Sequence, residues 1–97
     1  MSSQGNHEEF YRKLQVQLHD TSSWPAEYLY KFIVPTDKAK VDYIFNVFDN
    51  MGAVISTKIS RSGTYTSVSI NVKMKSPEKV IEKYKAVTDH VEGVISL

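Results

Sequence analysis

The sequence predicts an α+β domain in which two helices cover one face of a four-stranded antiparallel sheet. Residues 63–72, "GTYTSVSINV", alternate apolar and polar side chains with the period of a half-buried strand. Segments of strand and helix periodicity follow a leading helix in the order β-α-β-β-α-β. The chain has 97 residues, which suffices for one domain with a single core.

The leading helix is predicted at about residues 7–19. Asn6 is followed three residues later by Glu9, which resembles a capping box. Apolar residues then recur every four positions, as on one side of a helix: Phe10, Leu14 and Leu18. Residues 1–5 are small and polar, so we expect them to be disordered.

A strand and a helix are predicted on either side of Pro35. Residues 27–34, "EYLYKFIV", are aromatic and β-branched and too short for a separate helix. Thr36 is the predicted N-cap of the helix, and Asp37 suits its positive end. Gly52 ends it. Four apolar residues at helical spacing form its predicted inner side: Val41, Ile44, Phe45 and Phe48.

A β-hairpin follows, with strands at residues 53–60 and 63–74 and a turn at residues 61–63. Gly63 supplies the positive φ that such a turn usually needs. The apolar residues of the second strand are expected to face the helices: Val68, Ile70 and Val72. The alternate residues are then left on the open face of the sheet: Tyr65, Ser67, Ser69 and Asn71.

The last helix and strand are predicted at residues 77–89 and 93–97. Ser76 and Pro77 have the residue types of an N-cap and first helical position. The predicted inner side of this helix contains Val80, Ile81, Tyr84 and Val87. Right-handed crossovers in this βαββαβ order place both helices on one face of the sheet, so the other face stays open.

Composition excludes several classes of function. The chain has no cysteine, so disulfides, thiolate metal sites and cysteine nucleophiles are absent. No run approaches the roughly 18 apolar residues that span a bilayer, and no apolar leader follows Met1, so we expect a cytoplasmic protein without membrane contact. A net charge of +1 gives no overall field to attract nucleic acid, which makes it an unfavoured partner. No nucleotide-binding glycine pattern exists, and no cofactor is expected.

No catalytic motif is complete. The histidines are scattered, without the spacing that lets two imidazoles share a metal: His7, His19 and His90. His19 with Asp20 resembles a metal-phosphohydrolase dipeptide but lacks a second set of ligands. Ser67 and Ser69 lie on a strand and not at a nucleophile elbow. We therefore expect a protein that is not an enzyme, and keep an enzyme with an unrecognised site as a third hypothesis.

The hairpin is locally basic. No acid occurs from Asn50 through Pro77, whereas four residues there are basic: Lys58, Arg61, Lys73 and Lys75. One interpretation is a solvated edge whose lysines discourage edge-to-edge pairing. The other is a surface on which an anionic partner or ligand docks, with five candidate binding residues: Lys58, Arg61, Tyr65, Ser67 and Ser69.

Four short segments carry a further signal: "WP", "YKF", "TKISRSGTYTSVSINV" and "VISL", at residues 24–25, 30–32, 57–72 and 94–97. In these segments the chain resembles the YbeD-like family of small bacterial proteins with a domain of unknown function. The resemblance runs from about residue 23 to the end. Residues 1–22 are accordingly assigned to an N-terminal tail and helix, and residues 23–97 to a YbeD-type domain.

The resemblance implies a ferredoxin-like sandwich similar to the ACT regulatory domains, which bind amino acids beside metabolic enzymes. It implies no established activity. ACT domains hold their ligand at a glycine-containing turn after the first strand. Residues 34–40 read "VPTDKAK" there, so amino-acid binding in the usual ACT manner is not expected.

The leading hypothesis is a non-catalytic regulatory or interaction module. It would bind a protein partner or a small metabolite through the open sheet face and the hairpin. The alternative is RNA binding through the same face, where Tyr65 takes the place of a stacking aromatic although the full RNA-recognition signature is missing. Leu29 and Ile33 add apolar area to this face. We expect the apolar side of the leading helix to meet it, within one chain or between two copies of a homodimer.

Overall fold

The computed structural model describes residues 3–97, with side chains from residue 8 onward. The predicted order of elements is confirmed. The helices are α1 (Ser3–Thr21), α2 (Lys38–Val47) and α3 (Pro77–Thr88). The strands are β1 (Ala26–Pro35), β2 (Val54–Ile59), β3 (Tyr65–Met74) and β4 (Ile95–Ser96).

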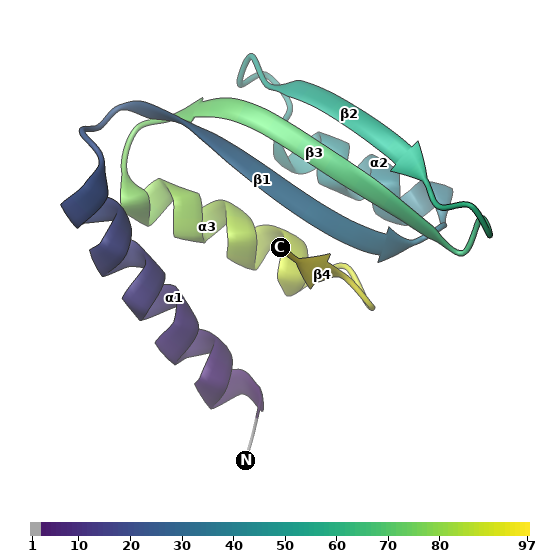
Figure 1. Ribbon diagram of the computed structural model, residues 1–97, viewed down its shortest axis with the longest axis horizontal. Helices are drawn as coiled ribbons and strands as arrows, with labels where there is room; N and C mark the ends of the chain where they lie inside the picture. Colours follow the sequence, from purple (N-terminus) through teal and green to yellow (C-terminus); the bar gives the residue numbers. More distant parts are fainter. Residues whose placement is uncertain (1–2) are drawn as a thin grey trace.

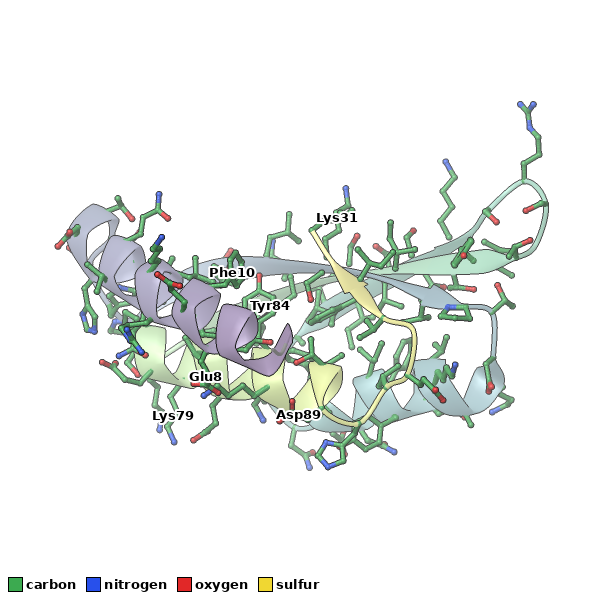
Figure 2. The ribbon with its side chains drawn as sticks, turned by 90° about the horizontal axis from the view of Figure 1, so that it is seen from below. Glu8, Phe10, Lys31, Lys79, Tyr84 and Asp89 are labelled. Carbon is green, nitrogen blue, oxygen red and sulfur yellow. The ribbon has the colours of Figure 1, made fainter. Side chains whose placement is uncertain are left out.

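The strands form one antiparallel sheet in the order β2-β3-β1-β4. This is the ferredoxin-like βαββαβ arrangement that the sequence predicts. β1 pairs with β3 along its whole length, from Ala26 to Pro35. Helices α2 and α3 cover one face of the sheet, and Figure 2 shows them on the side opposite the Lys31 side chain.

The core lies between this face and the two helices. Tyr30 and Phe32 of β1 are fully buried there, as are Val68 and Ile70 of β3. The four predicted inner residues of α3 are also buried. The Tyr30 hydroxyl donates to the carbonyl oxygen of Val80 at 2.9 Å. Because burial removes water from the phenolate, it raises the pKa of Tyr30 far above the usual range.

Tyr84 lies between α3 and the sheet (Figure 2). Its hydroxyl lies 2.8 Å from the Tyr28 hydroxyl, and burial raises its pKa as well. Within residues 8–97, every buried side-chain nitrogen and oxygen atom has a hydrogen-bond partner. The buried polar groups of these residues are therefore all hydrogen-bonded, and none is left without a partner in a way that would mark an internal binding site.

Two details of α2 differ from the prediction. Asp37 is the N-cap, and its carboxylate accepts from the N–H of Ala39 at 2.9 Å. The hydroxyl of Thr36 instead lies 2.9 Å from the hydroxyl of Thr66 on β3, so it is not available to cap. Phe45 is 40% exposed and does not belong to the inner side of the helix. The helix turns by about 100° per residue, so Phe45 points sideways when its neighbour Ile44 points at the sheet.

Helix α1 also differs. It begins at Ser3, so Asn6 lies inside the helix and does not cap it, and residues 3–5 are helical. The remainder of the predicted disordered segment lies outside the described residues. Tyr11 is the buried residue, with Leu14 and Leu18 partly buried, whereas Phe10 is 55% exposed.

Helix α1 runs alongside α3 and not over the open face of the sheet (Figure 1). The hydroxyl of Tyr11 lies 2.8 Å from that of Thr88, at the end of α3. The expectation that α1 covers the open face within one chain is therefore wrong. The inner side of α1 follows the spacing of Tyr11, Leu14 and Leu18, and this side meets the helix layer.

The last strand is shorter than the predicted residues 93–97. Gly93 has a φ of +82° and lies in the turn before β4. The N–H of Leu97 donates to the carbonyl oxygen of Lys31 at 2.9 Å, which continues the pairing by one residue. Most of the outer edge of β1 is thus not paired by β4.

An exposed polar contact links α1 to the start of α3. His19 Nε2 lies 2.7 Å from Glu78 Oε2, and Gln15 donates to the same oxygen at 3.2 Å. The hydrogen bond from His19 is the main cause that lowers the pKa of Glu78 below its usual value, helped by the backbone at the start of the helix.

Replacing His19 by alanine is expected to raise the pKa of Glu78 toward its ordinary value. A lowered pKa in the folded state gives stability that is present above the unfolded pKa and is lost as the pH falls through the folded pKa. The variant should therefore lose less stability on acidification than the parent. NMR titration of the Glu78 carboxyl carbon measures the pKa directly. His90→Ala is the control, since His90 bonds the carbonyl oxygen of Ala86 instead. An unchanged Glu78 titration in His19→Ala would contradict this contact.

Candidate binding face of the sheet

The open face of the sheet carries a row of side chains from all four strands. Ile33 on β1 pairs with Ile95 on β4 and with Ser67 on β3. Ser67 in turn pairs with Lys58 on β2. Since paired residues of neighbouring strands point to the same side, these four side chains lie next to one another across the sheet.

A shallow hollow of about 650 Å³ lies on this face where the hairpin turns. We call it the hairpin hollow. Four of the five predicted binding residues line it: Lys58, Arg61, Tyr65 and Ser67. Ser69 does not, because it lies one step further along β3, between Lys31 and Ser56.

Three further residues line the hairpin hollow: Ile33, Ile59 and Ser60. Ile59 and Ser60 are sequence neighbours of predicted residues. Ile33 comes from β1, which α2 separates from the hairpin in the sequence, and only the β1–β3 register brings it beside Ser67. The alternation of side chains along β1 predicts that Ile33 lies on the open face. No local pattern in the sequence predicts that Ser67 is its neighbour on β3.

Hydrogen bonds hold the turn that carries Arg61. The N–H of Ser60 donates to the carbonyl oxygen of Tyr65 at 2.8 Å, and the Tyr65 N–H donates back to the Ser60 hydroxyl at 3.1 Å. The N–H of Gly63 donates to the Ser60 carbonyl oxygen at 2.9 Å. The hydroxyl of Ser62 accepts from the N–H of Thr64. Ser60 and Ser62 of "SRSGT" therefore stabilise the turn through hydrogen bonds within it, and this fixes the position of the Arg61 backbone.

The described side chains do not neutralise the positive charges of the hairpin hollow. Neither Lys58 nor Arg61 forms an ion pair with a described residue, whereas Lys38 on α2 lies 2.7 Å from Asp42. No carboxylate lines the hollow. Tyr65 is 45% exposed, so its ring is accessible beside the two cations. The hollow thus combines positive charge with accessible apolar surface.

The structure places the groups with catalytic potential apart from one another. His19 contacts Glu78, and His90 Nδ1 lies 3.0 Å from the carbonyl oxygen of Ala86, while the His7 side chain lies outside the described residues. The hydroxyl of Ser67 donates to the carbonyl oxygen of Lys58 at 3.3 Å. Over residues 8–97 no three potential metal ligands come together. Over the described part of the chain, no helix is both long and apolar enough to cross a membrane.

Comparison with known families identifies this chain. No curated protein and no solved structure matches it. A family model described as "Protein of unknown function (DUF493)" matches residues 19–96, which includes the whole sheet and both helices that cover it. This is also the family of YbeD, so the resemblance of the sequence to YbeD-like proteins is confirmed. The chain therefore belongs to the DUF493 family of proteins of unknown function.

Proposed function

We propose that this protein is a non-catalytic interaction module that binds a protein partner or a small metabolite through the open sheet face and the hairpin. The observation that supports the proposal is the hairpin hollow, where Lys58 and Arg61 lie beside the accessible ring of Tyr65 without a carboxylate. Exposed cations next to apolar surface suit recognition of a partner.

The rest of the open face supports the same proposal. Ser67 and Ser69 follow Tyr65 along β3 at steps of about 7 Å, and short hydroxyl side chains let another surface approach closely. Leu29 and Ile95 are 57% and 52% exposed on this face. A surface that only contacts water would more often carry charged residues at such positions. A second copy of this chain is one protein partner that such a face would fit.

In this proposal the protein acts as a regulatory partner in the bacterial cytoplasm. The chain has no cysteine that an oxidising compartment would use. The resemblance to ACT domains favours a role beside another protein, with no reaction catalysed by this chain.

Lys58→Glu and Tyr65→Ala are expected to weaken partner binding by about 1–3 kcal/mol, because truncating central contacts has effects of this size. Both side chains are exposed, so the melting temperature should change little. The measurement is retention of proteins and small molecules on the tagged full chain from its own host, followed by mass spectrometry and titration of the retained molecule.

Arg12→Glu makes a similar charge reversal on α1, away from the open face, and should leave retention unchanged. Gly63→Val should act differently from the open-face variants, since a β-branched residue at a φ of +79° strains the hairpin itself. A partner that binds both open-face variants as tightly as the parent would remove the open face from the proposal.

RNA binding is the second candidate, and one observation favours it. The register places Lys31 of β1, Lys58 of β2 and Lys73 of β3 on the open face with Tyr65. RNA-recognition domains also use aromatic residues on the first strand. The open-face residues of β1 include Leu29, Lys31 and Ile33, and none of these is aromatic. Tyr65 on β3 would therefore be the one aromatic residue of these strands on which a base could stack. Single-stranded RNA affinity that falls steeply with salt would promote this function over the first.

A further inference from the structure

We infer that the hairpin hollow is a site for a small amphipathic anion: a carboxylate, sulfate or phosphate group on an apolar or aromatic body. This inference rests on the proposed function, and it names the ligand class that the open face takes.

The cations of the hollow point to the charged group. Lys58 and Arg61 come from the edge strand and from the adjoining turn, and neither pairs with a carboxylate of the described residues. Glu27 is the single acid that the register puts on the open face of the described sheet, and it pairs with Lys73 at the far end of β3. An anion in the hollow would thus meet two free donors and no nearby repulsion.

The apolar lining points to the body of the ligand. Ile33 and Tyr65 line the hollow from the open face beside the cations, and Ile59, which is 60% exposed, lines it at the end of the edge strand β2. A bare inorganic anion would leave this apolar surface in water. A neutral apolar molecule would cover the two cations without pairing them, which costs free energy. The volume of about 650 Å³ falls in the range of sites for small organic ligands.

A second basic hollow offers an internal comparison. It has a volume of about 390 Å³ and lies between the end of β3 and α3, where Lys73, Lys75, Lys79 and Lys83 line it. Two of these cations are already engaged, since Lys79 lies 3.5 Å from Glu82 and Lys83 donates to the carbonyl oxygen of Val47 at 3.0 Å. Positive charge alone therefore does not distinguish the hairpin hollow. The absence of a lining carboxylate does, because Glu82 lines the second hollow and no acid lines the hairpin hollow.

The test uses two probes with the same aromatic rings. 8-Anilinonaphthalene-1-sulfonate carries a sulfonate, and N-phenyl-1-naphthylamine does not. Titration of the full chain, followed by amide NMR, should show binding of the sulfonate with shift changes at Ile33 and residues 58–67. The neutral probe and inorganic sulfate should each bind at least about tenfold more weakly, since each satisfies one half of the site.

Lys58→Gln combined with Arg61→Gln should weaken binding of the sulfonate probe about tenfold, as expected for the loss of two exposed charge contacts. Lys73→Gln combined with Lys75→Gln is the matched control at the second hollow and should not weaken it. A dispersed amide spectrum and an unchanged melting temperature establish that each variant is folded.

Three results would each overturn the inference: equal affinity for the two aromatic probes, shift changes confined to another part of the surface, or full affinity in the Lys58/Arg61 variant. If partner retention still depends on Lys58 when the sulfonate probe does not bind, the small-anion site is wrong while the interaction face stands.

Discussion

Replacing Phe48 by alanine is expected to lower the free energy of unfolding by about 3–5 kcal/mol, the usual cost of truncating a buried aromatic residue. Phe48 is 2% exposed at the end of α2. Its ring centroid lies 4.9 Å from that of Tyr30, so the truncation leaves a cavity between α2 and the sheet. Equilibrium urea denaturation, followed by circular dichroism, measures the loss.

Phe45→Ala is the matched control, because it removes the same atoms from a residue inside α2, three positions before the C-cap Phe48, that is 40% exposed. We expect a loss of about 1 kcal/mol or less there, since part of the ring is already in water. Similar losses for the two variants would mean that α2 presents a different side to the sheet from the one described above.

Gly93→Ala is expected to lower the free energy of unfolding by about 2–4 kcal/mol, through two causes that add. The residue has a φ of +82°, where any Cβ atom is strained. A Cβ atom there would also lie 2.9 Å from Cγ of Pro35, and a proline ring cannot rotate away. The turn before β4 must then move, and β4 loses its place beside β1. Thermal and urea denaturation both report this loss.

Gly63→Ala separates the two causes. Its φ of +79° is nearly the same, but apart from its two chain neighbours no residue has an atom within 4 Å of the Cβ position. The variant should lose only the backbone term of about 1–2 kcal/mol. If both glycine variants lose equally, the contact with Pro35 does not contribute to stability.

The features that the sequence predicted correctly depend on local periodicity. The alternation from Tyr65 to Met74 separates the open face from the buried face of β3, and it does so with no exception. The N-cap at Ser76 is also correct, since its hydroxyl accepts from the N–H of Lys79. In both cases the physical cause lies within a few residues of the effect.

The features that it missed depend on contacts between distant segments. Thr36 and Asp37 are both good N-cap residues, and the choice between them is made by Thr66 on β3. Tyr11 is buried because Thr88 and Tyr84 of α3 lie beside it, whereas the four-residue spacing of apolar residues favoured Phe10.

The candidate site divides in the same way. Lys58, Arg61, Tyr65 and Ser67 are close in sequence and belong to one hairpin, so their proximity in the hollow could be predicted. Ile33 lines the hollow because the β1–β3 register places it beside Ser67, and no local sequence pattern specifies that register. Ser69 was included because it alternates with Ser67, but the hollow ends before it.

The position of Trp24 gives the protein a built-in optical reporter. It is the one tryptophan of the sequence, and its indole N–H donates to the carbonyl oxygen of Leu18 at the end of α1. The emission wavelength of Trp24 depends on how far water reaches the indole ring between α1 and β1. It therefore follows the attachment of α1 to the domain. Trp24 does not line the hairpin hollow, so its emission in an unlabelled sample follows detachment of α1 and not occupancy of the hollow.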